Sequence, residues 1–254
     1  MTAAVKAIET DGLTVRFGDF IALDKVSLAL KAGTTTGLIG PNGAGKTTLF
    51  HTLTGDLRPN DGHIHLNGRI LRKMSPDESA RQGIGKLFQD VRVFKNLTVF
   101  ENLLVACQNN GERAWFRSWW KGSRELENTY QDRIETVLSR VGLAASANEL
   151  AGRLSFGNQK ALGLGRLLAG DFSIFLLDEP MAGLSPARSE RMASIIREEA
   201  RKKDKTILII EHNMQHVKAL CDKTIALNRG KVFAESATAD VLSDPSVRDI
   251  CLGL

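Results

Sequence analysis

A glycine-rich stretch between an apolar segment and a helix-like segment constrains the fold of this chain most. Residues 34–40, TTTGLIG, are β-branched and apolar enough for a buried strand, and residues 46–55, KTTLFHTLTG, have helical spacing that ends at Gly55. Between them the chain matches the pattern GxxxxGK(S/T), which is typical of a phosphate-binding P-loop. The positions that satisfy it are Gly40, Gly45, Lys46 and Thr47. The strand–loop–helix order favours a P-loop over a glycine-rich turn with an incidental lysine.

Phosphate binding explains why these residue types occur together. Glycines let backbone N–H groups curl round a phosphate, and the N-terminus of the following helix adds a positive field. Lys46 is expected to reach the β- and γ-phosphates, and the Thr47 hydroxyl to ligate Mg²⁺. We therefore expect the chain to bind a nucleoside triphosphate. The predicted loop residues are Gly40, Pro41, Asn42, Gly43, Ala44, Gly45, Lys46, Thr47 and Thr48.

Two carboxylates follow a second apolar segment. Residues 173–180, SIFLLDEP, predict a strand that runs into Asp178 and Glu179, and open α/β sheets bind ligands at the carboxyl ends of their strands. A P-loop needs one acid for the Mg²⁺ shell and one group that orients the attacking water. Asp178 suits the first role and Glu179 the second. The alternative is a solvated acid pair at a strand end.

A third apolar segment ends at a histidine. Residues 205–212, KTILIIEH, predict a strand that neighbours the P-loop strand, so His212 is a candidate hydrogen-bond donor to the γ-phosphate. A histidine at a strand end can equally be an ordinary core or surface residue. The other four histidines are interpreted as ordinary, with His216 on the helix that follows. They are His51, His63, His65 and His216.

The order of these motifs carries a family resemblance. The P-loop is followed by KLFQD with Gln89, then LSFGNQK at 154–160, then FLLDEP, then EHNM. This order resembles the nucleotide-binding domain of ABC ATPases across almost the whole chain. The resemblance implies an α/β fold: a P-loop NTPase (RecA-like) core with an antiparallel β subdomain and an inserted α-helical subdomain. It implies one domain over 1–254, with the core at about 1–95 and 155–254 and the helical subdomain at about 96–154.

The resemblance also implies roles for further residues. Ser155 and Gly157 match the signature motif, which binds the γ-phosphate of an ATP held by the P-loop of a partner subunit. Gln89 matches the glutamine that touches Mg²⁺, takes part in catalysis and senses the transport partner. Phe17 matches the aromatic residue that stacks on adenine, the alternative being a core phenylalanine. One P-loop and one signature imply that two subunits, identical or different, pair head to tail.

Three positions depart from the family pattern. In the signature, Phe156 replaces a glycine and Asn158 replaces a glutamine. The chemistry needs the Ser155 hydroxyl and backbone N–H groups at a helix N-terminus, so we expect a functional signature with Phe156 turned away from the phosphate. Ser185 stands where an aspartate is usual, and with Pro186 it also predicts the start of a helix.

The sixty residues before the signature have mostly helical character. Thr98 and Glu101 predict a capping box, and residues 125–143 predict a helix with one apolar face packed on the core. Residues 113–124, RAWFRSWWKGSR, hold all three tryptophans and four basic residues. This segment is expected either to contact a membrane subunit or lipid headgroups, or to pack under the helical subdomain. The residues of the apolar face are Leu126, Tyr130, Ile134, Val137, Leu138 and Val141.

Composition fits a globular protein without an anchor. Of the 254 residues, 43% are apolar and 25% charged, and no apolar run approaches the length of a membrane span. The N-terminus shows no secretion signal, and three widely spaced cysteines favour a reducing compartment over a metal site. A net charge of +5 is compatible with nucleic acid, anionic lipid or nucleotide, and selects none of them.

The motifs together look like the ATP-binding subunits of branched-chain amino acid importers and their urea or amide relatives. This implies ATP and Mg²⁺ as cofactors, ATP hydrolysis coupled to transport, and a peripheral place on the cytoplasmic face of the plasma (inner) membrane. The implied partners are a second ABC ATPase subunit, two membrane permease subunits and a separate substrate-binding protein, with no nucleic acid. The alternative is a soluble ABC ATPase of a cytosolic assembly machine of the iron–sulfur cluster type. The transported solute is not encoded in this chain.

Overall fold

The structure is a computed structural model that describes residues 6–71, 75–107, 123–202 and 204–252; between 123 and 129 it describes the backbone alone. It consists of two compact units. The first comprises Met1–Lys86, Ser173–Glu179 and Ile196–Leu254, and the second Leu87–Phe172 and Pro180–Ile195. Most of the tryptophan-rich segment 113–124 lies outside the described residues.

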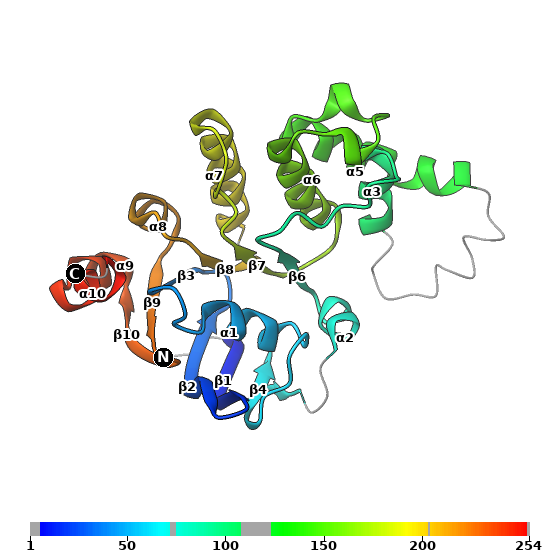
Figure 1. Ribbon diagram of the computed structural model, residues 1–254. Coiled ribbons are helices and arrows are strands. Elements are labelled where there is room, and N and C mark those ends of the chain that lie inside the picture. The colour runs from blue at the N-terminus through cyan, green and yellow to red at the C-terminus, as the bar shows by residue number, and fades with distance from the viewer. Residues whose placement is uncertain (1–5, 72–74, 108–122, 203, 253–254) are drawn as a thin grey trace. The chain divides into compact units, whose positions relative to one another are not determined.

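The first unit is built on a six-stranded sheet in the order β10-β9-β3-β8-β7-β6 (Figure 1). The three apolar segments of the sequence form its central strands, which are parallel and buried along their whole length. Such strands read as continuous apolar runs because both faces of the sheet are covered. The strands are β3 (Thr35–Ile39), β6 (Ile84–Leu87), β7 (Ile174–Asp178), β8 (Thr206–Ile210), β9 (Lys223–Asn228) and β10 (Lys231–Ala237), the last antiparallel to β9.

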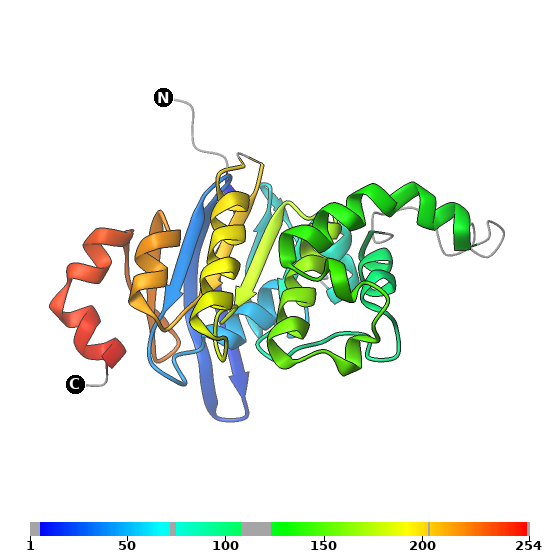
Figure 2. The same ribbon diagram turned by 90° about the horizontal axis from the view of Figure 1, so that it is seen from above.

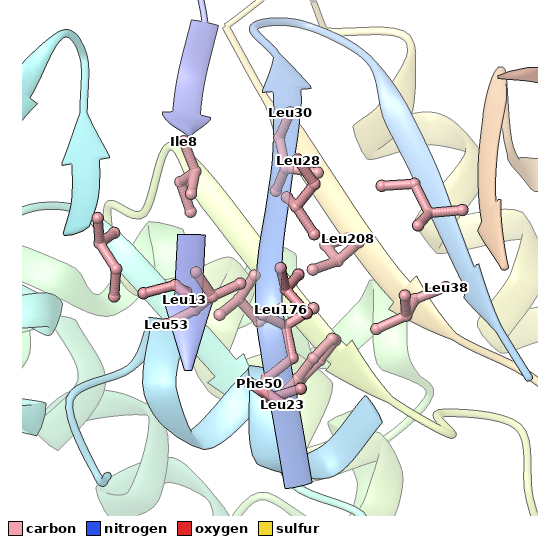
Figure 3. Packing of buried hydrophobic residues seen from close by; sticks show 14 of the residues in the cluster. Ile8, Leu13, Leu23, Leu28, Leu30, Leu38, Phe50, Leu53, Leu176 and Leu208 are labelled. Carbon is pink, nitrogen blue, oxygen red and sulfur yellow. The ribbon is translucent and has the colours of Figure 1, made fainter. Parts of the chain in front are cut away.

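A second, antiparallel sheet of four strands belongs to the same unit, in the order β2-β1-β4-β5. Its strands are β1 (Lys6–Phe17), β2 (Phe20–Lys31), β4 (Asp61–Leu66) and β5 (Arg69–Ile70). Leu13 and Leu23 from this sheet join Phe50 of α1 (Lys46–Leu53) and Leu176 and Leu208 of the parallel sheet in one buried cluster (Figure 3). Burying each such side chain contributes about 1.5–3 kcal/mol, so the core holds the two sheets and α1 together.

The remaining helices of the first unit are short. They are α2 (Pro76–Arg81), α8 (Met214–Leu220), α9 (Thr238–Ser243) and α10 (Pro245–Leu252). His216 lies on α8, as the sequence predicts.

The second unit is helical. Its helices α3 (Val99–Cys107), α5 (Ser123–Val141) and α6 (Phe156–Ala169) pack into one bundle, green in Figure 2. The unit also holds the 3-10 turns Ala144–Ser146 and Ala151–Arg153 and most of α7 (Pro186–Ala200). Within the described part of the chain, no helix combines the length and apolarity that crossing a membrane requires.

Local signals predicted the starts of α3 and α7 correctly. The Thr98 N–H donates to Glu101 Oε2 at 2.6 Å and the Glu101 N–H donates to Thr98 Oγ1 at 3.1 Å, which confirms the capping box before α3. Pro186 is the first residue of α7, and the Ser189 N–H donates to the Ser185 carbonyl. Along α5, Tyr130 is half-buried and the side chain of Leu126 is not described. The rest of the predicted face is buried: Ile134, Val137, Leu138 and Val141.

Candidate active site

The loop between β3 and α1 contains glycines where a side chain has no room. At Gly40, with φ of +147°, a Cβ atom would lie 2.1 Å from the Leu227 carbonyl oxygen. At Gly45, with φ of +100°, it would lie 2.6 Å from the Ala22 carbonyl oxygen. Positive φ and close backbone approach both require glycine. The backbone of β9 and β2 therefore lies too close to the loop for a larger residue at either position.

Lys46 places its ammonium group inside this loop. Its Nζ donates to the carbonyl oxygens of Gly40 at 2.8 Å and Pro41 at 2.9 Å. Burial lowers the pKa of Lys46, although nearby Glu179 raises it. An ammonium group has three N–H donors, so a third remains for an anion bound in the loop.

Asp178, the last residue of β7, is 4% exposed. Burial is the largest cause that raises the pKa of its carboxyl group, and the neighbouring Glu179 raises it further. An ionised carboxylate here costs free energy that a bound cation would offset. Among the described residues, no three His, Cys, Asp or Glu side chains gather as a metal cluster. One carboxylate with a hydroxyl such as that of Thr47 fits Mg²⁺ bound together with phosphates, since Mg²⁺ takes few protein ligands.

Glu179 and His212 lie together at the carboxyl ends of β7 and β8. His212 Nε2 is 2.8 Å from Glu179 Oε1, and the Glu179 N–H donates to the Ile210 carbonyl. Glu179 has φ of +46°, a left-handed conformation that is costly outside glycine and marks functional positions. β3 pairs with β8, which confirms that the strand before His212 neighbours the P-loop strand.

Two further residues lie near this site: Lys86 of β6, which no sequence motif singled out, and His51, which was expected to be an ordinary histidine. Lys86 Nζ lies 3.3 Å from Asp56 Oδ2 and 3.4 Å from His51 Nδ1. Both Lys86 and His51 lower the pKa of Asp178. This polar cluster therefore helps to keep the Asp178 carboxylate ionised. The signal in the sequence was a lysine inside an apolar strand, IGKL, which needs a polar partner when folded.

Phe17 is not a core residue. It ends β1 opposite Phe20, and the two side chains are 53% and 62% exposed. Exposed aromatic side chains at a hairpin end can stack on a flat ligand without disturbing the core.

The other predicted residues lie in the second unit. Gln89 is exposed in the bend after β6. Ser155 caps α6: its Oγ accepts from the Asn158 N–H at 3.4 Å, which confirms the helix expected after the signature. The Phe156 side chain is half exposed, and a Cβ atom on Gly183 would meet its ring at 3.2 Å.

Asp178 yields a stability prediction. The pKa of Asp178 is raised in the folded chain, so protonation of its carboxyl group favours the folded state. This contribution to stability is fully present below the pKa of the unfolded chain, and it is lost as the pH rises through the pKa of the folded chain. We expect the nucleotide-free Asp178→Asn variant to unfold about 2–4 °C higher than the wild type at pH 7. The difference should vanish below about pH 3, where the carboxyl is mostly protonated in both states. Thermal unfolding of both proteins across pH, without Mg²⁺, checks this; a lower unfolding temperature at pH 7 would contradict it.

Comparison with known proteins agrees with this geometry. The family model for ABC transporters matches residues 23–182. The chain belongs to the ABC transporter family. It is the ATP-binding cassette of that family, an ATPase, as the resemblance implied.

Relatives and solved structures of the family cover nearly the whole chain. The chain is 37% identical to the "High-affinity branched-chain amino acid transport ATP-binding protein LivG" of Salmonella typhimurium, over 97% of both chains. It is 34% identical to the corresponding BraF protein of Pseudomonas aeruginosa, also over 97% of both. A crystal structure of a nucleotide-free ATP-binding cassette from an ABC transporter has a TM-score of 0.82 at 31% identity, covering 96% of this chain and 98% of that one. The predicted fold class is confirmed, and the assembly-machine alternative is not favoured.

Proposed function

We propose that this chain is the ATP-binding and ATP-hydrolysing subunit of an importer of branched-chain amino acids or a related small polar solute. The observation that carries the proposal is identity of 32–37% over nearly the full length to several branched-chain amino acid transport ATP-binding proteins. ATP chemistry in this chain is supported because one compact unit contains the loop, Asp178, Glu179 and His212.

The first unit supplies the residues that bind ATP. The backbone N–H groups of residues 42–48 surround the phosphates, and Lys46 adds a positive charge with its third N–H. Phe17 stacks on the adenine, as its exposure allows. Thr47 and Asp178 would hold Mg²⁺, which when bound neutralises charge on the phosphates. Gln89, the third predicted Mg²⁺ ligand, belongs to the second unit.

Hydrolysis uses the pair at the ends of β7 and β8. Glu179 orients the attacking water and accepts its proton. His212, 2.8 Å from Glu179, is held where it can hydrogen-bond the γ-phosphate. Ser155 of the partner subunit closes the site from the other side, so turnover needs two subunits arranged head to tail.

The helical subdomain of about 96–154 would receive a membrane subunit. The full assembly would contain a second ABC ATPase, two permeases and a separate binding protein, at the cytoplasmic face of the plasma (inner) membrane. ATP binding would close the pair of ATPase subunits and hydrolysis would reopen it, which drives the permeases between their two states.

Purification from the native cells tests the proposal. We expect a tagged chain, extracted in mild detergent, to carry two very apolar membrane chains and a second ATPase, identified by mass spectrometry. Cells without this chain should lose uptake of labelled branched-chain amino acids, and regain it with the wild type but not with Glu179→Gln. Soluble partners alone would favour an assembly machine, and unchanged uptake would point to another solute.

A further inference from the structure

Arg188, in the first turn of α7, contacts the residue proposed to bind phosphate across the subunit interface. Its Nη1 donates to Ser155 Oγ at 3.1 Å. No carboxylate pairs with Arg188 among the residues that the structure describes, so the charge of its exposed guanidinium is not neutralised there. The chain thus brings an uncompensated positive charge to the N-terminus of α6.

Glycine at position 157 leaves room for the Arg188 guanidinium. A Cβ atom on residue 157 would lie 2.3 Å from Arg188 Nη1 and 3.1 Å from its Cδ. The arginine therefore lies against the first turn of α6, in space that any other residue at 157 would fill. Gly157 leaves room for a cation as well as for the approach of a ligand.

The hydrogen bonds of Ser155 leave its proton for another acceptor. Ser155 Oγ accepts from Arg188 Nη1 and, at the longer distance of 3.4 Å, from the Asn158 N–H. A hydroxyl has two lone pairs and one proton, so with both acceptor sites used the O–H can donate to a further acceptor. An oxygen of an anion is the natural partner for an O–H polarised by a guanidinium.

The segment that carries Arg188 is tied to α6 at another point. Lys160 is 2% exposed, and its Nζ donates to the Ala182 carbonyl at 2.7 Å. Gly183, which lies between Ala182 and Arg188 in the chain, is next to the Phe156 ring. Residues 182–188 are therefore held beside the signature, which limits where the Arg188 guanidinium can lie.

The electrostatics of this region favour binding of an anion. A helix N-terminus carries a partial positive charge, and a guanidinium beside it is repelled unless an anion lies between or near them. The fixed contacts hold Arg188 there nonetheless. The remaining N–H groups of the guanidinium can donate to the same anion as the Ser155 hydroxyl, since arginine has five.

We propose that Arg188 is a positioning residue of the signature, which orients the Ser155 hydroxyl and adds positive charge toward the γ-phosphate of the ATP held by the partner subunit. This rests on the proposed role of Ser155 across the interface. It predicts that Arg188 acts largely through Ser155 and that charge at position 188 matters.

Steady-state ATP hydrolysis by the complex purified from its own cells tests this inference. We expect Arg188→Gln to lower kcat about tenfold, as for the loss of one charge-assisted hydrogen bond. Arg188→Lys, which keeps the charge, should stay within about threefold of the wild type. In a chain that already carries Ser155→Ala, the Arg188→Gln change should lower kcat by less than about a further twofold, because the effects of coupled residues are not additive.

Two controls separate a local effect from damage to the fold. Arg191 lies one turn further along α7, and its guanidinium donates to the carbonyls of Ser139 and Arg140 instead. Arg191→Gln should leave kcat within about twofold. ATP affinity of the isolated Arg188→Gln chain, measured by calorimetry, should equal that of the wild type, because its own P-loop is unchanged.

The outcomes separate this inference from the proposed function. If Ser155→Ala lowers turnover and Arg188→Gln does not, or if the two losses simply multiply, the role of Arg188 is overturned alone. Equal damage from Arg188→Lys and Arg188→Gln would also overturn it, since charge would then be irrelevant. If Ser155→Ala itself hydrolyses ATP normally, the proposed action of Ser155 across the interface fails, and Arg188 falls with it.

Discussion

Glu179→Gln should bind ATP as tightly as the wild type while its turnover falls by about 100-fold or more, the size of a general-base contribution. Glutamine keeps the shape of the side chain and can still hydrogen-bond His212, which lies 2.8 Å from Glu179 Oε1. It cannot accept a proton from the attacking water. ATP should therefore accumulate unhydrolysed and hold two subunits together. Phosphate release and the mass of the complex with ATP, measured by light scattering, check both parts.

The chain offers a matched control for this variant. Glu211 follows β8 as Glu179 follows β7, and it is buried where Glu179 is only partly buried. Its Oε2 lies 3.7 Å from His216 Nδ1. Glu211→Gln removes a carboxylate that lies against His216, whereas His212 contacts Glu179, and we expect the Glu211→Gln variant to retain most of its turnover. Normal hydrolysis by Glu179→Gln would remove Glu179 from its proposed role.

Gly40→Ala is expected to have the second large effect, on both stability and nucleotide binding. A Cβ atom would lie 2.1 Å from the Leu227 oxygen and 3.1 Å from the Leu227 carbonyl carbon, so backbone of β9 or of the loop must move. Holding alanine in the backbone conformation of Gly40 alone costs about 1–3 kcal/mol of stability, and the clash with Leu227 adds to this cost. We expect unfolding free energy to fall by at least about 3 kcal/mol, measured in urea, and ATP binding to be lost.

Gly43 provides the comparison in the same loop. Its φ is +76°, yet a Cβ atom there would meet nothing within 4 Å. Gly43→Ala should therefore cost only the left-handed backbone penalty of about 1–2 kcal/mol. Equal stability losses in the two variants would show that contact with Leu227 is unimportant.

Much of the fold could be predicted because its signals are local. The buried strands ending at Asp178 and Ile210 are continuous apolar runs, and the capping box at Thr98 and Glu101 needs only a spacing of three residues. The P-loop is equally local, since its glycines and lysine lie within eight residues. The family resemblance extended these signals to Ser155 and Gln89, which no local pattern would have singled out.

Other features depend on residues far apart in the chain. Nothing near residue 188 in the sequence indicates that its guanidinium donates to Ser155, 33 positions earlier. Lys86 and His51 affect Asp178 only because β6, α1 and β7 fold together. The sequence also allowed Phe17 to be a core residue, and the structure shows that it lies at a hairpin end with its side chain 53% exposed.

The three buried strands, the P-loop and the family resemblance could be read from the sequence alone, because hydrophobic periodicity and glycine patterns act over a few residues. The folded structure was needed to see why Gly40 must be glycine, that Glu179 contacts His212, and that Arg188 donates to Ser155. The physical reason is that burial, charge and hydrogen-bond partners depend on neighbours in space, and packing distant segments together creates those neighbours.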